Sequence, residues 1–355
     1  MLRRDRPRRP IGLITLAAGG LAVLCEPALT PSADAHVKWF NRDYCVSCRP
    51  ESLQHILDQR WLWLLALFVL VSLCIFLIDR LWGESANRWI DRLVARIETP
   101  PQDYLRVGLG VFLLCLWLQP GVLLTPELRT SNPAIPWLQL ALAATTLSWR
   151  TTWIASCGIF FLYGLALEQY GLFHMLDYPI FFGIAAYLAI HSLRVSWLKP
   201  LAGSVLLSAV AATLLWASLE KWAYWVWTMP VVAQHPDIDL GFDPKAYILL
   251  AGFVEFFLAY FLLGGRFCNR LAAFGLLLIF VAAIFDFGKI DAVGHLMIIL
   301  SLVVIILQGA QPVTDFFTFP RLGITRGAFA SLGVLVVVLS GYVLGYFGLH
   351  HLIYG

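Results

Sequence analysis

Apolar stretches of about twenty residues recur along the whole chain and are separated by short polar bends. A stretch of this length crosses the hydrocarbon core of a bilayer as an α-helix, whereas an open sheet would leave backbone groups unpaired there. The stretches also lack the strict alternation of an outer-membrane barrel. The pattern therefore predicts an all-α membrane protein, a polytopic helical bundle with about ten transmembrane helices after a signal segment. The predicted spans are about 61–82, 104–124, 134–149, 152–169, 177–194, 200–219, 246–264, 270–286, 291–308 and 327–349.

The first residues have the features of a secretory signal. A basic start, MLRRDRPRR, precedes the apolar stretch IGLITLAAGGLAVLC, and the small-residue site Ala33-Asp34-Ala35 follows. We expect residues 1–35 to be a signal peptide cleaved after Ala35, with an uncleaved anchor as the alternative. Cleavage would make His36 the N-terminus of an external segment, 36–60.

Composition agrees with a membrane protein, because 60% of the residues are hydrophobic and only 13% are charged. If the chain starts inside, most Lys and Arg residues fall on the cytoplasmic side of the predicted spans. This predicts a multi-pass protein of the bacterial inner membrane, with the segment after the signal facing the periplasm. The net charge of +3 then reflects orientation in the lipid bilayer, and we expect no nucleic acid partner.

An internal repeat organises the middle of the chain. Matching Gly171 to Gly288 aligns a short polar turn before an apolar helix in both copies, and each turn follows a pair of helices joined by an Arg-containing bend. This predicts two four-helix units of equal orientation, 104–195 and 199–308. Two segments flank the units. Residues 61–103 are a first membrane helix and a cytoplasmic amphipathic loop from about residue 83, which a helix lying on the inner leaflet explains, and residues 309–355 are a cytoplasmic loop and the last membrane helix.

The second unit resembles a known family. The stretches ASLEKWAYW (217–225), GFVEFFLAYFLLGGRFCNRLAAFGLLLIF (252–280) and FDFGKIDAVGHLMIIL (285–300) are similar, in order and spacing, to the DoxX/DoxD-like membrane proteins. The resemblance implies a four-helix membrane unit and quinone-linked sulfur oxidation or association with redox partner proteins. The first unit shares it only loosely.

Ionisable residues within apolar helices are costly, so they are candidates for chemistry. Glu255 lies near the middle of its predicted span, where it would be neutral or pair with a cation such as Lys221 or Lys289. Asp291 and His295 are four residues apart, on one helix face, and can contact each other. We expect Glu255, His295 and Asp291 to handle protons at a quinone or another redox ligand, the alternative being structural hydrogen bonds between helices.

Further polar residues at the outer ends of the helices could help to bind the cofactor. Glu220, Lys221 and Lys289 are the candidates, and the alternative is that they are interfacial side chains reaching water. No phosphate-binding loop and no nucleotide-binding glycine motif is present.

The external segment contains a CxxC pair, Cys45 and Cys48. Three interpretations stay open: an exchanging redox pair, a static disulfide, or soft ligands for a metal. In the third, a free N-terminal His36 would bind copper together with Cys45 and Cys48.

The sequence thus predicts a DoxX-like redox protein that passes electrons from an external thiol or sulfur donor, or a partner protein, to a membrane quinone. If it is an enzyme, it is a quinone-linked oxidoreductase. An alternative is a non-enzymatic membrane protein for copper handling or complex assembly, and a third is a transporter with a site between the repeats.

Overall fold

The computed structural model describes residues 44–235, 238–239, 241–319 and 321–355. The regular structure of these residues is helical, apart from one isolated β-bridge between Val122 and Arg129. The predicted signal segment and His36 lie outside the described residues. The helices are α3 (Leu53–Ile56), α4 (Gln59–Val94), α5 (Pro101–Leu118), α6 (Ala134–Thr145), α7 (Thr152–Met175), α8 (Ile180–Ser192), α9 (Lys199–Ala223), α10 (Trp225–Gln234), α11 (Pro244–Leu263), α12 (Cys268–Gln308), α13 (Pro312–Thr318) and α14 (Ile324–Tyr354).

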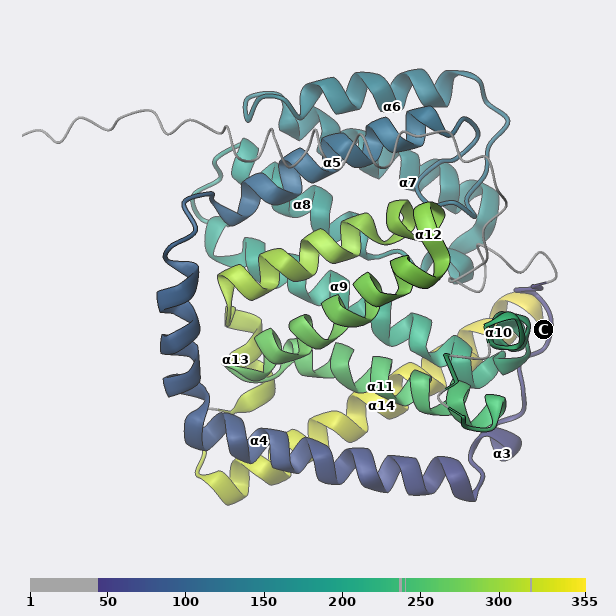
Figure 1. Cartoon of the computed structure of the whole chain (residues 1–355), viewed down its shortest axis with the longest axis vertical. Helices are drawn as coiled ribbons and strands as arrows, with labels where there is room; N and C mark the ends of the chain where they lie inside the picture. Colours follow the sequence, from purple (N-terminus) through teal and green to yellow (C-terminus); the bar gives the residue numbers. More distant parts are fainter. Residues whose placement is uncertain (1–43, 236–237, 240, 320) are drawn as a thin grey trace, which may run out of the picture.

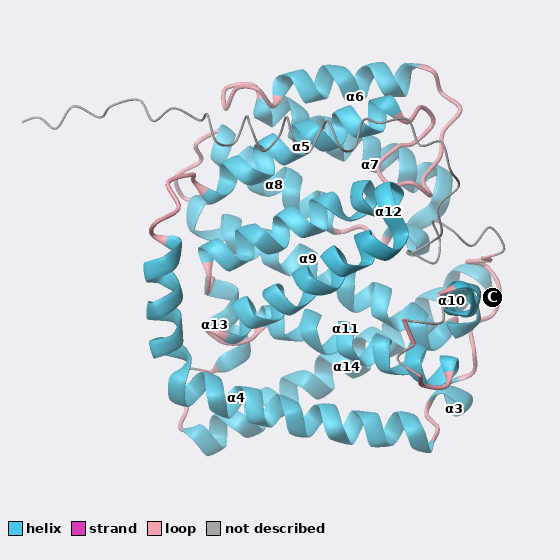
Figure 2. Cartoon of the chain, viewed as in Figure 1, coloured by secondary structure: helices cyan, strands magenta, loops and turns pink. Residues whose placement is uncertain are grey.

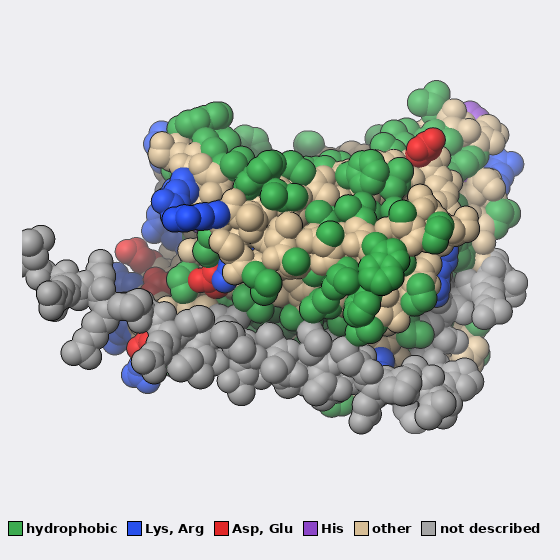
Figure 3. All heavy atoms as spheres, turned by 90° about the horizontal axis from the view of Figure 1, so that it is seen from above, with side chains coloured by type: hydrophobic (Ala, Val, Ile, Leu, Met, Phe, Trp, Pro, Cys, Tyr) green, Lys and Arg blue, Asp and Glu red, His purple; other side chains and the backbone are tan. Residues whose placement is uncertain are grey.

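The described helices form a multi-pass membrane protein. By length and apolar composition, five of them can cross a bilayer: α4, α9, α11, α12 and α14. The helices α6 and α8 are apolar but shorter, so the predicted number of spans remains a prediction. Charged side chains gather toward the two ends of the face in Figure 3, and hydrophobic or uncharged atoms lie between them. This distribution suits a protein surrounded by lipid at its middle.

The helices α5 to α8 lie in the upper part of Figures 1 and 2, with α9, α11 and α12 below them and α4 and α14 at the lower edge. The helix α8 packs on α9, and α12 packs on α5. A Cβ on Gly108 of α5 would meet the side chain of Leu300, so the part of α12 after Gly288 makes this contact. The fourth helix of each predicted unit therefore packs on the first helix of the other.

Two glycines break the long helices. Gly171 in α7 has φ 78° and ψ 164°, and Gly288 in α12 has φ 76° and ψ −152°. Residues other than glycine rarely adopt a positive φ, so the glycine at each position permits the bend. In Figure 1 the two arms of α12 meet at the bend and run back toward the same side of the bundle. The two glycines are the pair that the sequence repeat aligns.

The segment predicted as an amphipathic loop from about residue 83 is part of α4, which continues to Val94. The buried Arg270 on α12 holds this last part of α4 against the bundle. Its guanidinium lies 2.7 Å from the carboxylate of Asp91 and donates a 2.8 Å hydrogen bond to Asn87. A buried guanidinium needs such partners, so the end of α4 is held against the bundle.

Candidate functional site

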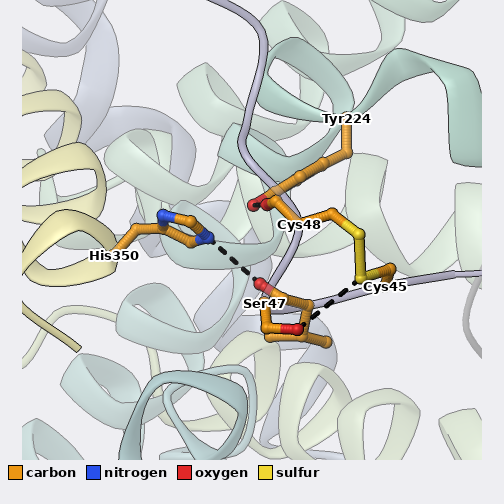
Figure 4. The surroundings of a disulfide bond; sticks show 6 residues. Cys45, Ser47, Cys48, Tyr224 and His350 are labelled. Carbon is orange, nitrogen blue, oxygen red and sulfur yellow. Dashed lines mark hydrogen bonds between the residues drawn. A yellow bond between two sulfur atoms is a disulfide. The ribbon is translucent and has the colours of Figure 1, made fainter. Parts of the chain in front are cut away.

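The CxxC pair is a disulfide. The sulfur atoms of Cys45 and Cys48 are 2.02 Å apart and the Cα atoms 5.2 Å apart. Cys48 is exposed and Cys45 is partly buried, and the Ser47 hydroxyl lies 3.6 Å from the Cys45 sulfur (Figure 4). In this state neither sulfur is a thiolate that could bind a metal.

Hydrogen bonds from two distant helices hold the peptide groups of this turn (Figure 4). The Tyr224 hydroxyl, at the end of α9, donates to the Cys48 carbonyl over 2.7 Å. Nε2 of His350, near the end of α14, donates to the Val46 carbonyl over 3.1 Å. We call the end of the bundle where α9 and α14 finish the disulfide end, and the other end the opposite end.

Glu51 provides a third attachment at the disulfide end. Its backbone N–H donates to the Ala223 carbonyl over 2.9 Å, and its carboxylate contacts Trp225 at 3.3 Å and His55 at 2.9 Å. Partial burial raises the pKa of the Glu51 carboxyl, because it disfavours the charged form. The hydrogen bonds from His55 and Trp225 stabilise the charged form by more, so the pKa of Glu51 is lowered. The disulfide turn is therefore fixed to the bundle through its backbone and through Glu51.

A buried group of ionisable side chains lies at the same end, and we call it the Glu127 cluster: Glu127, His174 and Tyr178. Nε2 of His174 lies 2.7 Å from Oε1 of Glu127, and the Tyr178 hydroxyl donates to the same oxygen. The side chains of Glu127 and His174 are only 1% and 4% exposed. Glu127 comes from the connection between α5 and α6, and it ties this connection to α7 and to Tyr178 just before α8.

Tyr44 joins the disulfide turn to the Glu127 cluster. It directly precedes Cys45, and its ring centroid lies 6.2 Å from that of His174. On its other side it meets Trp227 edge-on at 5.9 Å, and Trp227 stacks on Tyr224 at 3.9 Å. An aromatic layer thus separates the exposed disulfide from the buried cluster.

The residues predicted from the sequence in the second unit form two pairs. Glu255 on α11 pairs with Lys221 on α9, one of the two cations proposed for it, and the side chains are 17% and 27% exposed. A Cβ on Gly252 would collide with Trp222 of α9, so the glycine lets the two helices approach closely beside this pair.

Asp291 and His295 form the second pair, on the second arm of α12. The carboxylate lies 3.0 Å from Nδ1 of His295, and the two side chains are 0% and 7% exposed. The oxygens of Asp291 make no hydrogen bond within the described chain, so the contact has ion-pair distance without hydrogen-bond geometry. The Phe280 ring covers His295 at 4.7 Å.

The other two predicted cofactor-binding residues lie at the disulfide end. Glu220 is buried one position before Lys221 on α9, and Lys289 directly follows the Gly288 bend. All of the predicted site residues that the structure describes therefore belong to this end or to the neighbouring half of the bundle.

Sequence reasoning missed Glu127 and Tyr44 as neighbours of the disulfide turn. Glu127 lies in an irregular connection, where no periodicity indicates which way a side chain points. His350 reaches Val46 across 304 positions of sequence, a contact that only the packing of α14 creates.

Among the described residues, no group of three or more His, Cys, Asp or Glu side chains could hold a metal ion. The structure describes one cavity between α4, α11, α13, α14 and the start of α12, and an open apolar one between α7, α8 and α9. Neither is lined by Glu255, Asp291 or His295. Comparison with protein-family models, curated proteins and solved structures finds no match for this chain.

Proposed function

We propose that the chain is an inner-membrane redox protein that takes electrons from an external thiol or sulfur donor at the Cys45–Cys48 disulfide and passes them to a membrane quinone. The observation that carries the proposal is the placement of this disulfide. Cys48 is exposed, and the turn lies over buried ionisable groups at one end of a membrane bundle. An accessible disulfide sulfur is what an attacking thiolate requires.

The attachment of the turn supports exchange over a purely structural role. Tyr224 and His350 bind the carbonyls of Cys48 and Val46, and neither bond uses a sulfur atom. Opening the S–S bond therefore leaves the turn attached. A disulfide whose only task was to hold the segment would duplicate these contacts.

The electron balance is simple. Two donor thiols reduce Cys45–Cys48 to a dithiol and become a disulfide. Oxidation of the dithiol then re-forms the S–S bond and releases two electrons and two protons, which together convert one quinone into one hydroquinone.

The Asp291–His295 pair fits a proton-handling role at the quinone, since a buried carboxylate with unsatisfied oxygens can accept a proton or a donor. The His295 imidazole and the Lys221 ammonium are groups that can hydrogen-bond to a quinone oxygen, and the quinone would supply the two-electron acceptor. Glu255 holds Lys221 in place.

The distribution of positive charge supports the proposed orientation. Arginines gather at the opposite end, where Arg80 bonds Leu322 and Arg106 bonds Thr146, and this excess of positive charge supports a cytoplasmic location for that end. The disulfide end then faces the periplasm, an oxidising compartment.

The test starts from purified full-length protein reduced with a dithiol and freed of the reductant. Addition of a short-chain quinone should re-form the disulfide, seen as loss of alkylatable Cys45 and Cys48 by mass spectrometry, with one hydroquinone formed per disulfide. The variant Cys48→Ser should form none, and Cys157→Ser, which removes an exposed lone cysteine of α7, should behave as wild type. A dithiol that stays reduced while quinone is in excess would contradict the proposal.

A further inference from the structure

The Glu127 cluster takes no part in the electron path described above. We propose that it is a proton-exchange site for the Cys45–Cys48 couple, acting across Tyr44. This inference rests on the proposed thiol–disulfide function and adds to it the group that takes up the thiol proton.

The geometry defines where the proton resides. Two groups, Nε2 of His174 and the Tyr178 hydroxyl, aim at the same oxygen of Glu127. Both act as donors when Glu127 is ionised. An additional proton can then bind at Nδ1 of His174, the ring nitrogen that carries no proton when Nε2 donates to Glu127.

The burial of the cluster argues against a merely structural role. A carboxylate and an imidazole that are 1% and 4% exposed cost free energy of desolvation, and apolar side chains could anchor the same connection without it. Ionisable groups inside membrane bundles mark proton pathways. The Gly288 bend of the second unit is also followed by a buried carboxylate–histidine pair, Asp291 and His295.

The groups around His174 come from each element that packs on it. They are Glu127 from the connection, Tyr170, Asp177 and Tyr178 from α7 and its C-terminal turn, Tyr44 from the disulfide turn, and, beyond Phe173, His350 and Tyr354 from α14. Tyr44 is the one that belongs to the CxxC turn.

The chemical step is a proton transfer that accompanies exchange. A donor thiolate attacks the exposed Cys48 sulfur, the S–S bond breaks, and Cys45 leaves as a thiolate held beside the Ser47 hydroxyl. The Cys45 thiolate takes a proton from His174. A second donor thiol then resolves the mixed disulfide at Cys48, which leaves the Cys45–Cys48 dithiol and one donor disulfide. When the quinone of the proposed function oxidises the dithiol, the Cys45 thiol returns its proton to His174 as the S–S bond forms again.

The test measures how readily the thiols of the reduced full-length protein ionise. Iodoacetamide alkylation of Cys45 and Cys48 is followed by mass spectrometry across pH. In His174→Gln the midpoint should rise by about one pH unit, so about tenfold less thiolate is present at a given lower pH. Tyr178→Phe should lower the midpoint, because Glu127 loses a donor and attracts the proton on His174 more strongly.

The opposite signs distinguish proton exchange from loosened packing, which would move both variants in the same direction. His191→Gln, a half-buried histidine at the opposite end, should leave the profile unchanged, and thermal unfolding shows that each variant is folded. A folded His174→Gln protein with the wild-type profile would overturn the inference, as would shifts of equal sign in both variants. Should His174→Gln not fold, an unshifted Tyr178→Phe profile overturns it. Failure of quinone to oxidise the dithiol would refute the proposed function alone, because alkylation needs no quinone.

Discussion

The two predicted four-helix units bend at corresponding glycines, but different ionisable groups follow the two bends. After Gly171, His174 contacts the carboxylate of Glu127, which comes from the distant α5–α6 connection, and it lies next to Tyr44 of the disulfide turn. After Gly288, Asp291 contacts His295, four residues further along the same arm of α12.

The difference shows that a backbone bend fixes where polar groups enter the bundle but not what they contact. In the first unit the α5–α6 connection folds inward, so the pair is formed between elements. In the second unit the corresponding region contains α10, and the ionic contact between helices is Lys221 with Glu255. The carboxylate–histidine pair of the first unit is therefore the one that lies next to the disulfide turn, through Tyr44, whereas the second unit binds the backbone of that turn through Tyr224.

Removal of Glu127 should have the largest effect on stability. Glu127→Ala leaves a buried histidine and tyrosine without their acceptor, which should lower the free energy of unfolding by about 3–5 kcal/mol. Glu255→Ala should cost only about 1 kcal/mol, because Lys221 is 27% exposed and can reach water. Denaturation of both variants in the same detergent tests this. Equal losses would show that the two units do not differ in this way.

The next largest loss of stability is expected from substitutions at the two glycine bends. Gly171→Ala and Gly288→Ala should each destabilise the protein by about 1–2 kcal/mol, because alanine is strained at a φ near 78° or 76°. Gly164→Ala is a matched control on α7, since a Cβ there meets nothing within 4 Å. It should be neutral or stabilising. Thermal unfolding separates the three, and a Gly171 variant as stable as the control would contradict the strain argument.

His350 should slow reduction of the disulfide, whereas the adjacent His351 should have no effect on it. His350→Ala removes the hydrogen bond to Val46, worth about 1 kcal/mol, and should make the disulfide several-fold faster to reduce with a small thiol. His351→Ala, an exposed position, should leave the rate unchanged. Identical rates in the two variants would show that α14 does not hold the turn.

The smallest expected effect is on the rate of disulfide reduction at acidic pH. The pKa of Glu51 is lowered in the folded protein, so its contribution to docking is present above the ordinary carboxyl pKa and is lost as pH falls through the lowered value. Reduction by a water-soluble phosphine, corrected for the pH dependence of the reagent, should speed up modestly between about pH 5 and about pH 3. Glu51→Gln should abolish this acid dependence, and an unchanged profile in that variant would count against the assignment.

The sequence predicted well what depends on neighbours along the chain. Helices lie over each predicted apolar range, although α12 covers two of them without interruption apart from its glycine. The contact between Asp291 and His295 follows from helical spacing alone. The amphipathic segment from about residue 83 was expected to be a helix on the inner leaflet, and it is helical as the last part of α4, but no sequence signal shows that Arg270 holds it against the bundle.

What the sequence by itself determined is the helical, membrane-embedded character of the chain, the positions of its two glycine bends, and a cysteine pair close enough to bond. These depend on hydropathy, on the steric freedom of glycine and on a short separation. Only the tertiary structure decided that Tyr44, His350 and Glu127 meet at the disulfide end. Their contacts join residues tens to hundreds of positions apart, and such contacts depend on how whole helices pack against one another.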